Sequence, residues 1–187
     1  MIINGKTLLS AAPIADMLDH KAKAHGVSNG LAEVGYDIRI KQDVRFMPRN
    51  PRRAFAIAKA SMSEGEAWRL EAAMLGTVAV DGDVALGQFA LASSPDLFQM
   101  PADLVGVVHD KSTWARQGLG VFNTVIEPGW HGELVLELTY HGTEPLHIPA
   151  GAGIAQVIFH SITEPVEYTG KYQHQRGVTP AIMEGQA

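Results

Sequence analysis

An alternation of leucine with other side chains from residue 133 to 140 constrains the fold of this chain more than any other feature. Successive side chains of a strand point to opposite faces, so the leucines would share one face, with Glu133, Val135 and Glu137 on the other. Shorter strand-like runs occur at 36–40, 77–80, 84–91 and 155–160. Turns rich in Gly, Pro and Asp separate them, which predicts an all-β sandwich, jelly roll or barrel.

Two segments depart from this pattern. Residues 7–24 carry apolar side chains at roughly helical spacing, which predicts a helix that is interrupted near Pro13 and ended at Gly26. The segment 47–53 is rich in proline and arginine and predicts an exposed loop, whereas 56–75 fits a helix or a strand equally well.

Length and composition indicate one domain and exclude several kinds of site. A chain of 187 residues without internal repeats is expected to form a single domain, 1–187, with a polar C-terminal tail over 168–187. The chain has no cysteine, which excludes disulfides, zinc fingers, iron–sulfur clusters and cysteine nucleophiles. No two of its eight histidines stand four residues apart, so we expect no zinc site.

Charge and hydropathy narrow the set of partners. The formal net charge of −5 and the isoelectric point near 5.9 argue against a general nucleic-acid-binding protein, which would be basic. The chain lacks an apolar stretch of about 18 residues, and its first residues are not a basic start followed by an apolar run. We therefore expect a cytoplasmic protein that binds neither nucleic acid nor a membrane.

One short match tests the zinc question directly. His131, Gly132 and Glu133 have the H-x-E form of zinc-dependent nucleobase deaminases. That chemistry also needs a P-C-x-x-C pair to hold the metal, and the chain has no cysteine. The match therefore predicts no metal site, and we expect His131 in a turn.

Four ordered motifs lie in the second half of the chain. They read KSTWARQGL at 111–119, EPGWHGELVLEL at 127–138, GAGIAQVIF at 151–159 and KYQHQRG at 171–177, and VGYDIRI at 34–40 precedes them. Together they resemble the signatures of the dCTP deaminase branch of the dUTPase-like superfamily, in the same order and over most of the chain.

The resemblance implies a fold, an assembly and a substrate class. The fold would be mainly β, a distorted jelly roll or dUTPase-like β-clip barrel with an N-terminal helix. The assembly would be a homotrimer with active sites between subunits, and the tail would close over the ligand as a lid. The substrate would be a deoxynucleoside triphosphate, accompanied by Mg2+ that phosphate oxygens and water hold, with no metal ligand from the protein.

The same resemblance implies a catalytic set of Glu137, Ser112 and Arg116. Hydrolytic deamination at C4 of cytosine needs a base to activate water and an acid to protonate the ring and the departing amine, and one carboxyl can serve both steps. Glu137 would be this proton shuttle, with its pKa raised among apolar neighbours. Ser112 would hold the water and the exocyclic group, and Arg116 would stabilise charge near the base.

Further positions would bind the nucleotide. Besides the catalytic set, the resemblance implies contacts to phosphate, sugar or base from Lys111, Thr113, Glu127, Val135, Leu136, Gln156, Tyr168, Lys171 and Gln175.

Two departures from the family pattern leave the reaction open. Glu127 stands where the family has aspartate, and the loop 123–127 is about two residues shorter than usual, near the part of the pocket that would surround C5 of the base. The leading hypothesis is deamination of dCTP, or of a C5-modified dCTP, to the dUTP analogue and ammonia. The alternatives are a dUTPase-type diphosphohydrolase, alone or coupled to deamination, and a non-catalytic nucleotide-binding trimer.

Overall fold

A computed structural model describes residues 1–46, 84–85 and 89–183, and in this part the chain is mainly β. The expected loop at 47–53, the ambiguous segment 56–75 and the expected strand at 77–80 lie outside the described residues.

The largest sheet is built around β13 (Gly153–Ser161), which pairs with β8 (Leu104–Asp110) on one side and β4 (Tyr36–Arg39) on the other. All of its pairings are antiparallel. The remaining strands of this sheet are β10 (Val125–Ile126) beyond β8, β3 (Val27–Leu31) and β2 (Lys21–Ala24) beyond β4, and β1 (Ile2–Ile3), which pairs with β13.

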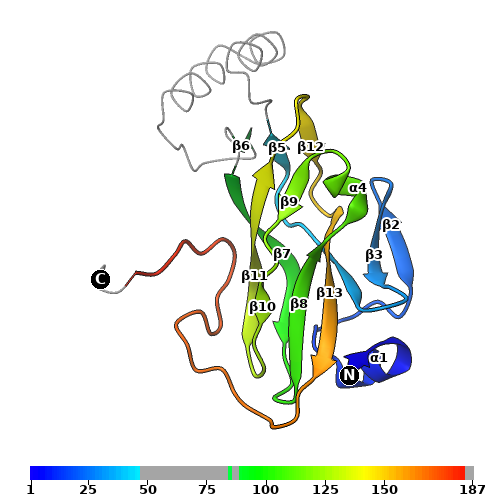
Figure 1. The fold of residues 1–187 in the computed structure, drawn as a ribbon, viewed down its shortest axis with the longest axis vertical. Coiled ribbons are helices and arrows are strands. Elements are labelled where there is room, and N and C mark those ends of the chain that lie inside the picture. The colour runs from blue at the N-terminus through cyan, green and yellow to red at the C-terminus, as the bar shows by residue number, and fades with distance from the viewer. Residues whose placement is uncertain (47–83, 86–88, 184–187) are drawn as a thin grey trace.

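Two smaller sheets complete the β structure (Figure 1). In one, β11 (His131–Tyr140) lies between β7 (Phe89–Gln99) and β9 (Leu119–Val121). The other joins β12 (Leu146–Ile148), β5 (Val44–Phe46) and β6 (Val84–Ala85), and the described helices are α1 (Gly5–Ala11) and α4 (Ser112–Ala115). These distorted sheets confirm the predicted mainly β fold with an N-terminal helix, although they do not close into a barrel.

The predicted long N-terminal helix is wrong beyond α1. Ala12 caps α1 in the left-handed conformation with φ 46°, and Ile14 then forms a β-bridge with Phe98 of β7. Further on, β2 and β3 form a hairpin whose turn residues, His25 and Gly26, have φ of 52° and 78°. Of the apolar side chains at helical spacing, Leu8 and Ile14 are buried in the core, whereas Leu9, Met17 and Leu18 are only partly buried. Gly26 makes a turn between strands.

The alternation at 133–140 is confirmed as β11. Its leucines are buried, with Leu136 and Leu138 at 1% and 0% exposure, and they belong to the same core as Phe98 and Phe159. Glu133 and Glu137 remain partly exposed on the other face, where Val135 is also buried. This face of β11 therefore carries polar groups next to a well-packed core.

The C-terminal residues 162–183 contain turns but no helix or strand. Figure 1 shows this tail, coloured orange to red, leaving β13, passing beneath the sheets and rising on the side of the molecule where β11 is drawn. Hydrogen bonds described below fix part of it against β11, so the tail packs on the fold.

Candidate active site

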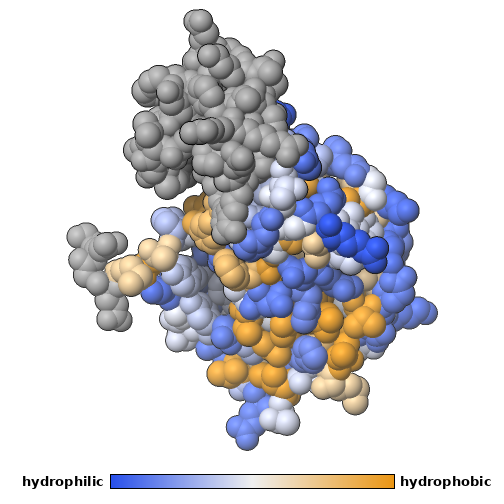
Figure 2. All heavy atoms as spheres, turned by 45° about the horizontal axis from the view of Figure 1, so that its top comes forward, coloured by the Kyte–Doolittle hydropathy of each residue, from blue (hydrophilic) through white to orange (hydrophobic). Residues whose placement is uncertain are grey.

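A cavity of about 480 Å³ lies among β10, β11, the start of β7 and the tail. Its walls are largely apolar, with Phe89 and Leu91 from β7, Val125 and Ile126 from β10, and Leu134 from β11 among the lining residues. Figure 2 shows the end of the described tail standing away from the body, with hydrophobic surface on the part of the body nearby. The cavity is partly open to solvent.

Glu137 is the central ionisable group of this cavity. Its carboxyl is half-buried, and burial raises the pKa of Glu137 above the ordinary value for glutamate because the charged form loses hydration. Its backbone is fixed by β11, which pairs it with Leu91 of β7, and its carbonyl accepts a hydrogen bond from the Phe122 amide at 3.0 Å. The desolvation predicted for Glu137 is thus present.

The outer edge of β11 is paired at its two ends by different segments. Residues 138–140 pair with β9, whereas at 131–133 the tail forms the backbone bonds His174 N to His131 O and Glu133 N to Gln175 O, of 2.7 and 3.0 Å. Val135 and Glu137 lie between these pairings and line the cavity.

Most of the loop 123–127 borders the cavity. Thr124, β10 and Glu127 all line it, and the Glu127 side chain is exposed. Two carboxylates, Glu127 and Glu137, therefore face one cavity from different elements. A substrate between them would meet an apolar wall formed largely by β7 and β10.

Trp130 joins this corner to the tail. Its indole N–H donates to the Tyr172 carbonyl at 2.8 Å, and its ring packs against Phe98 with centroids 6.0 Å apart. Tyr168 is partly buried against the core, and together with Tyr172 and Gln175 it lines the cavity. The tail thus forms one wall, while its closing as a lid stays a prediction.

The motif at 111–119 forms α4 and lies outside this cavity. Trp114 is buried and donates its indole N–H to the Gly153 carbonyl at 2.7 Å. The Lys111 ammonium forms an ion pair with Asp37 at 2.5 Å and donates to the Ser28 hydroxyl at 2.9 Å. Only 9% of the Lys111 side chain and 5% of the Asp37 side chain are exposed, so Lys111 anchors α4 to the large sheet.

Within one chain, the predicted site residues fall into two groups. The cavity brings together Glu127, Val135, Glu137, Tyr168 and Gln175. The residues that do not line it are Lys111, Ser112, Thr113 and Arg116 on or beside α4, Leu136, Gln156 and Lys171.

Each residue outside the cavity has a specific setting. Ser112, Thr113 and Arg116 are exposed on α4. Leu136 is buried on the opposite face of β11. Gln156 donates to the Val34 carbonyl at 2.8 Å, and the Lys171 ammonium bonds the Ile182 carbonyl. Their proposed contacts to nucleotide stay predictions.

Several cavity residues were not singled out from the sequence as site residues, among them Trp130, Tyr172, Phe89 and Leu91. Trp130 and Tyr172 stand inside the quoted motifs, so the motifs contained a signal for them. Phe89 and Leu91 share one face of β7, but the sequence read there as a continuous apolar run, which does not show which residues face a site.

Comparison with known proteins identifies the family. The sequence profile of the dCTP deaminase-like family matches residues 8–162. The chain belongs to the dCTP deaminase-like family. Proteins named dCTP deaminase from Campylobacter lari and Gemmatimonas aurantiaca are 35% and 32% identical over 167 and 169 residues. These alignments cover 84% and 86% of this chain and 83% and 85% of the relatives, so the resemblance and the enzyme family predicted from the motifs are confirmed.

Solved structures of dUTPases also match this dCTP deaminase-like chain, at low sequence identity. The native EIAV dUTPase is 15% identical with a TM-score of 0.45, covering 95% of this chain and 96% of that one. A mutant dUTPase from phage phi11 of S. aureus is 14% identical with a TM-score of 0.46, covering 74% of this chain and 83% of that one.

Two further observations bear on metals and membranes. In residues 1–46, 84–85 and 89–183, no three His, Asp or Glu side chains come together as a metal site would require. None of the helices in the same residues is long and apolar enough to cross a membrane.

Proposed function

We propose that this chain hydrolyses the C4 amino group of a deoxycytidine triphosphate, releasing ammonia and the deoxyuridine triphosphate. The observation that carries the proposal is Glu137, a half-buried carboxyl with a raised pKa on the wall of an open, largely apolar cavity. The named relatives, dCTP deaminases at 32–35% identity, supply the reaction class.

In the proposed reaction Glu137 moves two protons in sequence. Its carboxylate takes a proton from water, whose oxygen bonds to C4, and the resulting carboxylic acid protonates N3 of the ring. The second proton of that oxygen then passes through Glu137 to the exocyclic nitrogen. The C4–N bond breaks, and water and cytosine have become uracil and ammonia. Because burial raises the pKa of Glu137, its carboxylate is a stronger base for the first transfer, and the acid formed can still protonate N3.

We propose that the active site is completed by a second copy of the chain in a homotrimer. Ser112 and Arg116 are exposed on α4 and do not line the cavity that contains Glu137, so they are available to a neighbouring subunit. Ser112 would hold the attacking water, and Arg116 would stabilise negative charge on the intermediate. Lys171 and Gln156, also outside the cavity, are further candidates for this interface.

Mg2+ belongs to the substrate in this proposal. A triphosphate carries Mg2+ through its own oxygens and water, a set of ligands that suits this hard cation. This arrangement needs no protein cage of carboxylates. The ion would neutralise part of the phosphate charge when the nucleotide binds, while the base lies against Glu137.

The apolar cavity wall supports a proposal about the base of the substrate. Val125, Ile126 and Leu91 line the cavity near the shortened loop, and such a wall accommodates a methyl group on C5 at little cost. We propose that the enzyme accepts C5-methylated as well as unmodified dCTP. Comparable kcat/KM values for the two would support this, and turnover of dCTP alone would contradict it.

Diphosphohydrolysis is a second candidate because Glu127 shares the cavity with Glu137. A carboxylate in that position could activate water for attack on the α-phosphate, releasing pyrophosphate. Parallel assays of ammonia and pyrophosphate, with dCTP and dUTP as substrates, separate the two reactions. Ammonia without pyrophosphate supports deamination alone, and pyrophosphate without ammonia replaces the first proposal by the second.

A subunit-mixing experiment tests the shared site. Glu137→Gln and Ser112→Ala variants, each inactive alone, are unfolded together and refolded as mixed trimers. If the two residues act from different subunits, roughly a quarter of the sites recover both intact groups. Separately refolded variants, mixed afterwards, are the control. Recovery of activity supports the intersubunit site, and absence of recovery in verified mixed trimers contradicts it.

A further inference from the structure

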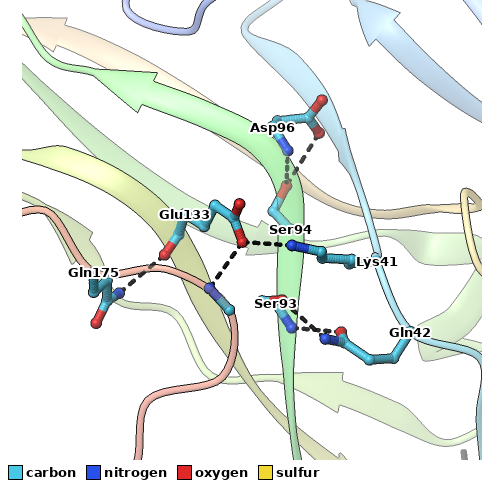
Figure 3. Close-up of polar contacts among 8 residues, drawn as sticks. Lys41, Gln42, Ser93, Ser94, Asp96, Glu133 and Gln175 are labelled. Atoms are coloured by element: carbon cyan, nitrogen blue, oxygen red, sulfur yellow. Dashed lines mark hydrogen bonds and ion pairs between the residues drawn. The ribbon is translucent and has the colours of Figure 1, made fainter.

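The Glu133 side chain lies outside the cavity but contacts the tail that forms one of its walls. Its carboxylate Oε2 accepts from the Lys41 ammonium at 2.9 Å and from the Gly177 amide at 2.8 Å. Its backbone exchanges two further bonds with Gln175, from Glu133 N to Gln175 O and from Gln175 Nε2 to Glu133 O. Figure 3 shows Glu133 between Lys41 on one side and the tail on the other.

Lys41 is held firmly on the body of the molecule. It follows β4, and its amide donates to the Ser93 carbonyl at 2.8 Å. Gln42 adds two bonds to Ser93, one from its side-chain amide to the hydroxyl and one accepted from the Ser93 backbone amide (Figure 3). The ammonium that contacts Glu133 thus extends from a fixed backbone.

The environment keeps Glu133 ionised. Only 16% of its side chain is exposed, and the hydrogen bond from Lys41 lowers the pKa of Glu133, with the Gly177 amide acting in the same direction. A hydrogen bond to an ionised acceptor is roughly twice as strong as a neutral one. The Gly177 amide therefore has a stronger partner than a neutral side chain would provide.

We propose that Glu133 is a positioning residue that clips the tail to β11 and thereby sets the cavity wall for the substrate. The tail residues Tyr172, Gln175 and Thr179 line the cavity on both sides of the clipped Gly177. Loss of the carboxylate would remove the bond to Gly177 and loosen the tail beyond Gln175, whose bonds to the Glu133 backbone remain, while Glu137 stays in place on β11. The effect on substrate rests on the proposed function, whereas the attachment of the tail does not.

Hydrogen exchange tests the attachment without any substrate. In Glu133→Ala, amides of the peptide spanning 173–179 should exchange about fivefold faster than in the wild type, because Gly177 loses its acceptor. Glu133→Gln keeps the size of the side chain, so it serves as a second variant in case Glu133→Ala misfolds. It should give a smaller increase in the exchange rate. Glu33→Gln removes the carboxylate of the exposed Lys21–Glu33 pair and is the matched control, with no change expected.

Kinetics with the triphosphate test the positioning role. Glu133→Ala should raise KM about fivefold while kcat changes less than twofold, since Glu137 is not moved. Unchanged exchange at 173–179 in Glu133→Ala would overturn the clip, whether or not the protein deaminates dCTP. Faster exchange with unchanged KM would overturn the positioning role. Absence of ammonia release by the wild type would refute the proposed function instead, while the exchange result would still decide the clip.

Discussion

The ion pair between Lys111 and Asp37 gives the sharpest prediction about stability. The two side chains are 9% and 5% exposed, and Ser28 donates to Asp37 at 2.8 Å while it accepts from Lys111. Removing one member of a buried ion pair costs about 3–5 kcal/mol, because the remaining charge is left without its partner. In Lys111→Met the Ser28 hydroxyl still donates to Asp37, so we expect a loss at the lower end, about 3 kcal/mol.

Urea unfolding at fixed protein concentration measures this loss. With a slope of about 2 kcal/mol per molar urea, the midpoint of Lys111→Met should fall by about 1.5 M. The double variant with Asp37→Asn should recover part of the loss, because no buried charge remains without a partner. Lys21→Met removes an exposed ion pair of the same type and should leave the midpoint unchanged.

The same experiment separates two roles of Lys111. If its ammonium anchors α4, stability falls and kcat falls with it, because Ser112 follows directly in the chain. If the ammonium instead serves to bind the triphosphate, Lys111→Met should raise KM and leave the urea midpoint where it is. That second result would refute the reasoning from burial.

Three further predictions address the cavity and its supports. Glu137→Gln should lower kcat by about 10²–10⁴-fold, because the proton transfer is lost. It should not lower the urea midpoint at pH 7, because it removes a partly buried charge. Since the base acts as the carboxylate, a pH–rate profile of the wild type should show kcat/KM rising with pH through a pKa above that of ordinary glutamate. Trp130→Phe, which loses the bond to Tyr172, should reduce the unfolding free energy by about 1 kcal/mol. Gly153→Ala would place a Cβ 1.8 Å from the Ser28 carbonyl and should cost about 1–3 kcal/mol or more by urea unfolding.

The strands were predictable where one face is apolar and the other polar. In β11 the leucines recur at every second position, although Val135 on the other face is also buried, so both the strand and the side of Glu137 followed from the sequence. At the N-terminus the spacing of apolar residues resembled a helix, but Ile14 is used in a bridge to Phe98. The spacing of apolar residues indicates which side chains are buried, but a sheet can bury them as well as a helix can.

The motifs predicted residues that the cavity contains only in part, and Ser112 and Arg116 lie outside it. Glu127, Glu137 and Tyr168 were expected in one site and lie in one cavity. The clip at Glu133 was not predictable, because it depends on the folding of the tail back to β11. Glu133 and Gln175 stand 42 positions apart in the sequence. The local sequence around Glu133 contains no signal for a partner so far along the chain.

One strand connects these supports to the residues proposed for the chemistry. Asp37, Arg39 and Lys41 stand at every second position along β4 and its continuation, and each pairs with a different element. Asp37 binds Lys111 at the start of α4, Arg39 binds Asp96 in the irregular part of β7, and Lys41 binds Glu133 of β11. Residues that share one face of a strand move together when its register shifts. A shift in the register of β4 would therefore change the contacts to α4 and β7 together, which gives Asp37 and Arg39 of the early VGYDIRI motif a structural role beside Ser112.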